Sequence, residues 1–208
     1  MAAERFDDLA ATILNGPARL GPVRAVAVDG PTGSGKTTFA ARLAESLSAA
    51  GATVALVHTD DLLDGWDDQF SFWHRLEEGV LAPLRAGRPG RYPVYDWVRG
   101  RFDGVRDVPV PDVLVLEGST AARAAVRPEL TRSVFVYAPA ELRLNRVLAR
   151  DGADVRESLL RWMNAEEAYF LADGVHDGVD ALIDGAPKVG HDPRNEFVRL
   201  PRPGETDD

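Results

Sequence analysis

The sequence predicts an α/β fold in which a parallel, five-stranded sheet is covered by helices on both faces. Two observations carry this prediction. Short, almost wholly apolar runs alternate with segments of helical periodicity, as in sheets that are buried on both faces. A glycine-rich stretch, residues 30–38, joins the first of these runs to a helical segment. Because ligands bind such sheets beyond the carboxyl ends of the strands, the polar residues that follow each run should gather at one edge.

The strands are predicted from the apolar runs and the helices from side chains that recur every three or four positions. The five predicted strands are residues 23–28, 53–58, 113–116, 133–137 and 181–183. Helices are predicted at residues 4–14, from the glycine-rich stretch to about 50, and at 72–85, 139–150 and 155–172.

The remaining segments set the predicted domain organisation. Residues 86–112 hold many glycines and prolines and are expected to form one long loop. We expect residues 1–185 to form a single domain, with a small helical lid at about 150–160. Residues 186–208 are polar and rich in proline, and are predicted to be a C-terminal extension that is partly disordered, above all at 204–208.

The composition excludes several kinds of site. The formal net charge of -9 argues against a nucleic-acid surface, which needs a basic face. The chain has no cysteine, so disulfides, thiolate nucleophiles and cysteine-ligated zinc are excluded. The first 14 residues include acids and no long apolar run, so we expect no signal peptide, no membrane contact and a cytoplasmic protein.

The glycine-rich stretch is Gly-Pro-Thr-Gly-Ser-Gly-Lys-Thr-Thr and matches G-x-x-x-x-G-K-[ST], the phosphate-binding P-loop. Glycines let the backbone curl around phosphate oxygens, and the following helix adds free N–H groups and its positive dipole end. Lys36, which we expect to act in catalysis, should reach the outer phosphates of a nucleotide, and the Thr37 hydroxyl should reach Mg²⁺. We therefore expect a nucleotide to contact Gly30, Thr32, Gly33, Ser34, Gly35, Lys36, Thr37 and Thr38.

The use of lysine supports this interpretation over a strand-to-helix turn without a ligand. The chain has 24 lysines and arginines, yet lysine stands only at Lys36 and Lys188. A planar guanidinium does not replace a compact ammonium well as a phosphate clamp. The position of Lys36 in an arginine-rich chain therefore favours a functional P-loop.

Three acids follow predicted strands. Asp60 and Asp61 come directly after the second strand, and Glu117 ends the third, in the place of a Walker-B acid. A phosphoryl-transfer enzyme needs carboxylates to deprotonate the acceptor hydroxyl and to hold Mg²⁺. The alternative is that these acids cap the turns that follow them. An acid that closes an apolar run is costly unless it is paired, which favours a function for Glu117.

Arg143, Arg146 and Arg150 are spaced i, i+3 and i+7 and so share one helix face. Over the P-loop they could neutralise charge on a transferring phosphoryl group, and we expect Arg150 to act in catalysis and Arg146 to bind the nucleotide. The alternative is a solvated basic face. Trp162 and Glu166 follow in the last long helix, with Tyr169 one turn on, and their spacing is more typical of a core-facing stripe than of a site.

Together these residues resemble the uridine kinase family, and more broadly the uridine kinase-like P-loop metabolite kinases. The similar segments are residues 29–38, 59–61, 93–97 (Pro-Val-Tyr-Asp-Trp), 114–118 and the helix at 143–151. The resemblance implies the three-layer P-loop NTPase fold and an ATP- and Mg²⁺-dependent kinase. It implies that Asp60 is the catalytic base and that Thr37, Asp60 and Glu117 support Mg²⁺. Tyr95 and Asp96 would line a nucleoside site, which we expect Asp61 and Glu117 to border.

The sequence departs from that family around the acceptor. Asp61-Leu62-Leu63 replaces Ser-Phe-Tyr, and the family's Glu-Arg-Gly-Arg and His-Pro-x-Ala-Phe-Asp runs are missing. The acceptor therefore stays open between a nucleoside such as uridine or cytidine and another metabolite such as pantothenate. A nucleotide-binding regulatory module without an acceptor is a third alternative. The choice of ATP or GTP as donor and the oligomeric state, a homo-oligomer included, are also left open.

Overall fold

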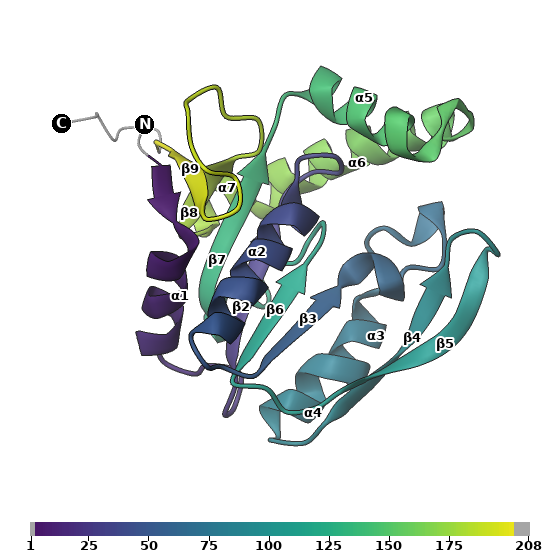
Figure 1. Ribbon diagram of the computed structural model, residues 1–208. Coiled ribbons are helices and arrows are strands. Elements are labelled where there is room, and N and C mark those ends of the chain that lie inside the picture. Colours follow the sequence, from purple (N-terminus) through teal and green to yellow (C-terminus); the bar gives the residue numbers. More distant parts are fainter. Residues whose placement is uncertain (1–2, 202–208) are drawn as a thin grey trace.

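The computed structural model describes residues 3–201, whose centre is one seven-stranded sheet (Figure 1). Its strands are β1 (Ala3–Arg5), β2 (Arg24–Asp29), β3 (Val54–His58), β6 (Val113–Glu117), β7 (Leu130–Tyr137), β8 (Ala181–Asp184) and β9 (Glu196–Leu200). Their order is β1-β9-β8-β7-β2-β6-β3. The five strands from β8 to β3 are mutually parallel, which confirms the predicted parallel sheet. Two strands that were not predicted extend it by antiparallel pairing: β9 pairs with β8, and β1 pairs with β9.

The central strand β2 explains why both faces of the sheet are buried. Ala25 and Ala27 pack into a core on one face, and Val26 and Val28 pack into a second core on the other. The strand pairs with β6 on one side and β7 on the other, so the chain leaves it at the point where the strand order reverses. Ligands of open α/β sheets bind at this switch point, and the P-loop begins there.

Helices cover both faces of the sheet, as predicted. On one face lie α1 (Phe6–Asn15) and α2 (Lys36–Ala49), whose apolar side chains join the core of Val26 and Val28. The core on the other face takes side chains from α3 (Trp73–Leu76), α4 (Ala82–Arg85), α6 (Arg156–Asp173) and α7 (Val175–Gly178). One π-helical turn, Glu77–Leu81, joins α3 to α4, so the helix predicted at 72–85 is continuous.

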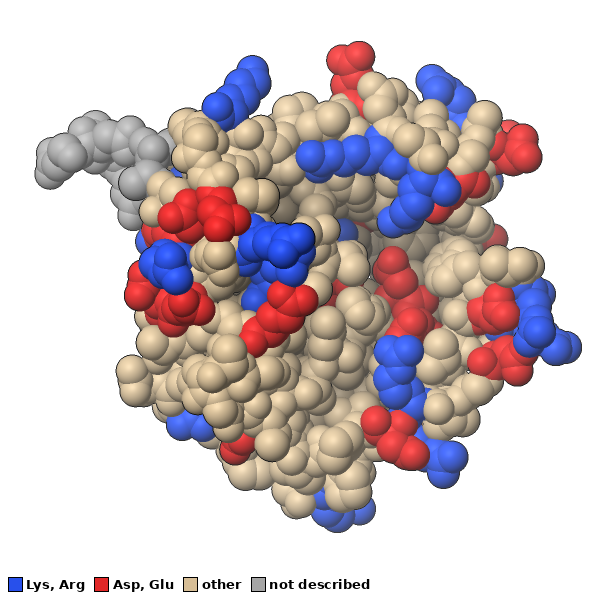
Figure 2. Space-filling view, in the orientation of Figure 1, with Lys and Arg blue, Asp and Glu red and all other residues tan. Residues whose placement is uncertain are grey.

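The helix pair α5 (Ala140–Asp151) and α6 lies across the carboxyl ends of the parallel strands (Figure 1). Val147 of α5 and Leu159 and Met163 of α6 form a small core of their own. The segment between them, where a lid is expected, holds Gly152 and a short 3-10 turn, Ala153–Val155. Figure 2 shows basic side chains along this upper rim, above a hollow in the surface.

The prediction of one long loop at residues 86–112 is wrong. This region forms a separate antiparallel hairpin of β4 (Gly90–Asp96) and β5 (Arg101–Val108). Proline suits a strand only at an edge or a bulge, and the register shift between Pro93 and Tyr95 provides that place. Tyr92 and Val108 anchor the hairpin in the main core.

The C-terminal segment contributes to the core, which its polar composition did not predict. Phe197 of β9 packs its ring at 5.1 Å from Phe6 and 5.3 Å from Phe39. These contacts join α1, α2 and β9. Residues 204–208, expected to be disordered, lie outside the described residues. Within the described range, no helix is long and apolar enough to cross a membrane.

The packing of β9 can be tested by truncating its aromatic ring. Phe197→Ala should lower the free energy of unfolding by about 3 kcal/mol, because the ring is buried among other aromatic side chains. Urea denaturation followed by circular dichroism measures this change. The control Val98→Ala, at a hairpin-turn residue that is 97% exposed, should change it little. Equal stability of the two variants would contradict the packing described for β9.

Candidate active site

The P-loop connects β2 to α2 with glycines in conformations that other residues avoid. Gly30, Gly33 and Gly35 have φ angles of 140°, 79° and 107°. A Cβ atom at Gly30 would lie 2.3 Å from the carbonyl oxygen of Val136, and one at Gly33 would lie 2.6 Å from that of Arg143. The loop therefore needs glycine at these positions, both for its curvature and for its close packing on β7 and α5.

Lys36 is the first residue of α2, and its side chain folds back across the loop. Its Nζ donates a hydrogen bond to the carbonyl oxygen of Pro31 at 3.2 Å, and the residue is buried. The N–H groups at the start of α2 and this ammonium therefore belong to the same concave loop. Such an arrangement attracts phosphate oxygens.

Glu117, at the end of β6, is buried and has two partners on neighbouring elements. It accepts a hydrogen bond from the Thr37 hydroxyl at 3.3 Å, and its other oxygen lies 2.5 Å from Nδ1 of His58. The hydrogen bond to Glu117 raises the pKa of His58, helped by the charges of Asp61 and Asp60 and opposed by burial. His58 is paired with Glu117 in the sheet register. The His58 side chain therefore holds the Glu117 carboxylate from the side of β3.

Asp60 lies in the 3-10 turn Thr59–Leu62, directly after β3. Its side chain opens into the cavity, but the surrounding protein and the negative charge of Glu117 raise the pKa of Asp60 to about 6. The turn packs closely on the end of β6, since a Cβ atom at Gly118 would overlap the Thr59 side chain. Two adjacent strands thus deliver two carboxylates to the edge of the sheet where the P-loop lies.

The arginine face of α5 is directed at the P-loop, and its members differ in their contacts. Arg143 is buried and donates to the carbonyl oxygen of Thr32 at 3.3 Å. Arg146 donates to the carbonyl oxygens of Gly33 and Gly185 at 3.2 and 3.0 Å, bridging the P-loop and the turn after β8. Arg150 is exposed and forms two 2.7 Å hydrogen bonds with Asp151.

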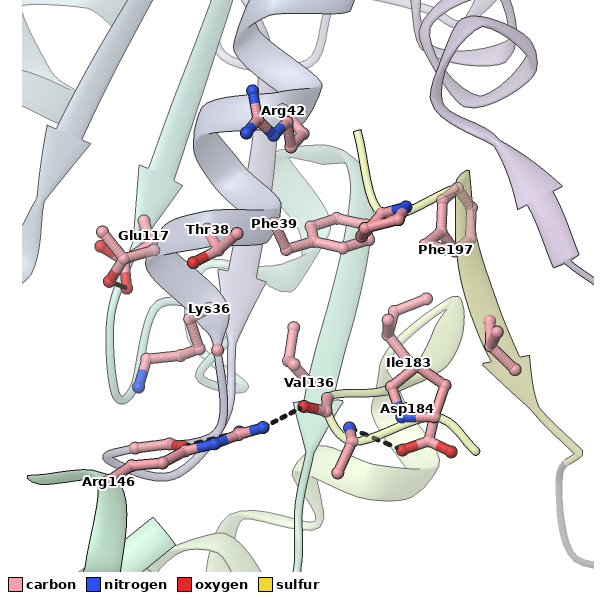
Figure 3. A pocket seen from close by; sticks show the side chains of 18 of the residues that line it. Lys36, Thr38, Phe39, Arg42, Glu117, Val136, Arg146, Ile183, Asp184 and Phe197 are labelled. Atoms are coloured by element: carbon pink, nitrogen blue, oxygen red, sulfur yellow. Dashed lines mark hydrogen bonds between the residues drawn. The ribbon is translucent and has the colours of Figure 1, made fainter. Parts of the chain in front are cut away.

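A cavity of about 790 Å³ brings most of the predicted donor-site residues together (Figure 3). Lys36, Glu117 and Arg146 lie at one end, and Phe39, Ile183 and Phe197 lie toward the other, where Asp184 is placed beside Ile183. The predicted site residues that line it are Thr32, Gly33, Gly35, Lys36, Thr37, Thr38, Asp60, Glu117, Arg146 and Arg150. Side chains and turns from the segment at 184–198 line it as well, which the sequence did not suggest.

Of the residues predicted to contact an acceptor, Glu117 lines that cavity, whereas Asp61, Tyr95 and Asp96 are not among its described lining residues. These three all contact other residues of the protein. Asp61 accepts hydrogen bonds from Arg106 at 2.7 Å and from the Tyr92 hydroxyl at 3.2 Å. Asp96 caps the hairpin turn by accepting from the backbone N–H groups of residues 98 and 99. Tyr95 packs edge-on against Trp97, whose indole N–H donates to the Asp60 carbonyl oxygen at 3.1 Å.

The side chains around Thr37 fit Mg²⁺ together with a nucleotide. The Thr37 hydroxyl and the Asp60 and Glu117 carboxylates are hard oxygen ligands lining one cavity. In residues 3–201 no group of three or more His, Cys, Asp or Glu side chains is arranged to hold a metal alone. Mg²⁺ commonly takes one or two carboxylates and completes its shell with water and substrate phosphates. Thr37, Asp60 and Glu117 would hold it beside the P-loop.

Asp29 supports the site but was not predicted as functional. Its buried carboxylate accepts from the backbone N–H groups of Gly30, Thr120 and Ala122 at 2.6, 3.0 and 2.8 Å. Burial raises the pKa of Asp29 to about 7, against the effect of these donors. The carboxylate holds Thr120 at a φ of 75°, the only positive value for a non-glycine residue in the described chain. The sequence signal that could have identified Asp29 is an acid at the end of an apolar run, directly before the P-loop.

Comparison with known proteins begins with a protein-family model. Residues 26–170 match the model of an AAA domain, which is well over half of the chain. A curated relative, the signal recognition particle 54 kDa protein of Pyrobaculum calidifontis, is 36% identical over 105 residues, or 50% of this chain. The chain spans only 22% of the length of that relative.

Solved structures share the fold over most of their length. A possible uridine kinase from Bacillus stearothermophilus matches with a TM-score of 0.64 and 22% identity, covering 86% of this chain and 96% of that one. A protein described as a fructose transport system kinase, from Silicibacter sp. TM1040, matches with a TM-score of 0.58 and 19% identity, covering 79% and 95%. These likenesses confirm, at the level of the fold, the resemblance to the uridine kinase family.

The close packing at Gly33 predicts the effect of adding one methyl group. Gly33→Ala should weaken Mg-ADP binding roughly ten-fold or more, because the loop must move off the backbone of α5. Isothermal titration calorimetry measures this affinity. Gly51→Ala is the matched control, since Gly51 also has a positive φ, 93°, but a Cβ atom there would meet open space. Unchanged affinity in Gly33→Ala would contradict the tight loop geometry.

Proposed function

This chain belongs to the AAA domain family, and from that premise we propose that it is an ATP- and Mg²⁺-dependent small-molecule kinase. It would transfer the γ-phosphate of ATP to a hydroxyl group, with a nucleoside such as uridine or cytidine as the favoured acceptor. One observation carries the proposal: Asp60, Thr37 and Glu117 line the same cavity as the P-loop and Lys36. A phosphate cradle, an oxygen-ligand set and a base candidate are the parts that phosphoryl transfer requires.

On the donor side, the P-loop backbone and Lys36 would hold the nucleotide phosphates. Arg146 already bridges the P-loop and the turn after β8, so it would keep the two walls of the donor site together. Arg150 lines the same cavity and is bonded to Asp151 in the present structure. We infer that Arg150 changes partner when the nucleotide is bound. Bound Mg²⁺ would neutralise charge on the β- and γ-phosphates.

Asp60 is the residue proposed to start the transfer. Its carboxylate would take the proton of the acceptor hydroxyl as the hydroxyl oxygen bonds to the γ-phosphorus. The bond between that phosphorus and the β–γ bridging oxygen breaks, which leaves ADP and a phosphorylated acceptor. A pKa of about 6 leaves Asp60 ionised at neutral pH and makes it a stronger base than an ordinary aspartate.

Aromatic side chains beside Asp60 support a planar acceptor. Trp97 is bonded to the Asp60 backbone, and its ring lies 5.2 Å from Tyr95 and 5.6 Å from Trp66. Trp97 is 40% exposed and therefore retains surface for a ligand. A nucleobase presents the flat, partly apolar face that such rings contact. The paired state of Asp61 and Asp96 favours the aromatic side chains over these acids as the first contacts.

A transfer assay with γ-labelled ATP tests the reaction and the acceptor class. The screen should include uridine, cytidine, other nucleosides, pantothenate and simple sugars. We expect transfer to a nucleoside. Transfer only to a non-aromatic metabolite would overturn the nucleoside assignment and keep the kinase. Saturable nucleotide binding without transfer to any acceptor would favour a regulatory module.

The role of Asp60 is tested by removing its basicity while keeping its shape. Asp60→Asn should lower kcat roughly 100-fold or more, because a positioned general base contributes about that much. The Kd for ATP measured without Mg²⁺ should stay close to that of the unchanged protein, because Asp60 is proposed to contact Mg²⁺ and the acceptor rather than the P-loop. Asp67→Asn is the control and should keep full activity, because Asp67 is an exposed acid a few residues further along the chain. Full activity of Asp60→Asn would exclude it as the base.

A further inference from the structure

Glu166 of α6 is a buried carboxylate that the proposed reaction does not use. It is 1% exposed and, within the described chain, is not part of the cavity lining. An isolated buried carboxylate is strongly unfavourable, so its surroundings must compensate for the lost water. Arg143 is the nearest cation, at 3.9 Å, which is a long separation for an ion pair. Most of the compensation therefore comes from hydrogen-bond donors.

Those donors on one side belong to the phosphate site. Both Glu166 oxygens lie 3.0 Å from the backbone nitrogen of Thr32, the third residue of the P-loop. The Thr32 hydroxyl also donates to Glu166, at 2.7 Å. The Ser119 hydroxyl, in the turn after β6, lies within hydrogen-bond distance of both Glu166 and the Gly30 carbonyl oxygen, and its single proton can be donated to either. The Glu166 carboxylate is thus bonded directly to Thr32 and linked to Gly30 through Ser119.

The same Glu166 oxygen, Oε1, that accepts from the Thr32 and Ser119 hydroxyls also accepts a hydrogen bond from the indole N–H of Trp162, at 2.9 Å. The Trp162 ring packs edge-on against Trp66 at 5.6 Å, and Trp66 packs in the same way against Trp97. Trp97 in turn bonds to the backbone of Asp60. We call Trp66, Trp97 and Trp162 the indole row. It runs from Glu166 to the proposed acceptor side of the site.

We propose that Glu166 is a positioning residue that couples the P-loop to the indole row. The inference rests on the proposed function, because it takes the P-loop to be occupied by a nucleotide. The phosphates of a bound nucleotide would place negative charge beside Thr32 and so alter its bonds to Glu166, and the shared carboxylate would pass that change to Trp162. If nucleotide binding changes the affinity of the indole row for a ligand by some factor, then by linkage that ligand changes the affinity for the nucleotide by the same factor. Glu166 would thereby make donor and acceptor binding interdependent.

The indole N–H resonances of the tryptophans provide a readout that needs no acceptor. The chain has four tryptophans, and of the described residues none of these four lines the nucleotide cavity. In protein labelled with ¹⁵N-tryptophan, a titration with Mg-ADP should shift the Trp162 resonance, and the Trp66 resonance by a smaller amount. Single Trp→Phe variants assign the signals, and calorimetry on the same samples gives the Kd.

Glu166→Gln should largely abolish the Trp162 response and weaken Mg-ADP binding roughly ten-fold, or about 1.4 kcal/mol. Trp162, Ser119 and the Thr32 hydroxyl all donate to Oε1. The amide therefore removes the negative charge and sets an N–H group against the Thr32 backbone N–H that now meets Oε2. Glu167→Gln is the matched control: it removes a neighbouring, exposed carboxylate of the same helix and should leave both measurements unchanged. A purely structural role for Glu166 would lower the melting temperature without removing the Trp162 response.

The outcomes separate this inference from the proposed function. Mg-ADP binding without a Trp162 shift, or with the same shift in Glu166→Gln, overturns the coupling and leaves the nucleotide site intact. No binding of Mg-ADP overturns both. If Glu166→Gln does not fold, Trp162→Phe removes the indole donor but keeps the carboxylate. The Trp66 response should then disappear, and its persistence would overturn the coupling.

Discussion

The close approach of three backbone segments to the P-loop is the constraint on which the rest of the site depends. β7 lies against Gly30, α5 lies against Gly33, and Gly185, after β8, lies against Ser34, where a Cβ atom would sit 2.0 Å from the Ser34 carbonyl oxygen. No side chain fits at these contacts. The loop is therefore shaped by its neighbours before any phosphate arrives, and a preorganised cradle loses less entropy on binding.

Much of the architecture could be predicted because its signals are local. The alternation at Ala25, Val26, Ala27 and Val28 fills two cores, and each parallel strand is an apolar run. The hairpin at 90–108 was missed because only its ends are buried and Pro93 interrupts the strand pattern. β9 was missed because its strand character comes from pairing with β8, across the loop at residues 185–195, and with β1, at the other end of the chain.

In the candidate site too, residues with a local sequence signal were predicted, and those that depend on distant partners were not. The P-loop lies within one short segment, and Asp60 and Glu117 directly follow apolar strands, so the pattern alone placed them at one sheet edge. Glu166 bonds to Thr32 across 134 positions, and the spacing of α6 by itself indicated only a core-facing stripe. Asp61 and Asp96 are suitable residue types at suitable places, yet a charge partner and a backbone turn satisfy them. Whether such an acid is left to bind a ligand or is paired within the protein depends on its neighbours in space, which a linear pattern does not contain.

The hairpin of β4 and β5 forms a sheet of its own, with no strand pairing to the main sheet in residues 3–201. The P-loop, by contrast, is built into the main sheet and its covering helices. Under the proposed function, the main sheet with its helices binds ATP and the hairpin binds the acceptor. These two parts of the fold therefore differ in how freely their residues can be substituted. Substitutions in the hairpin can alter the choice of acceptor while the donor machinery is kept.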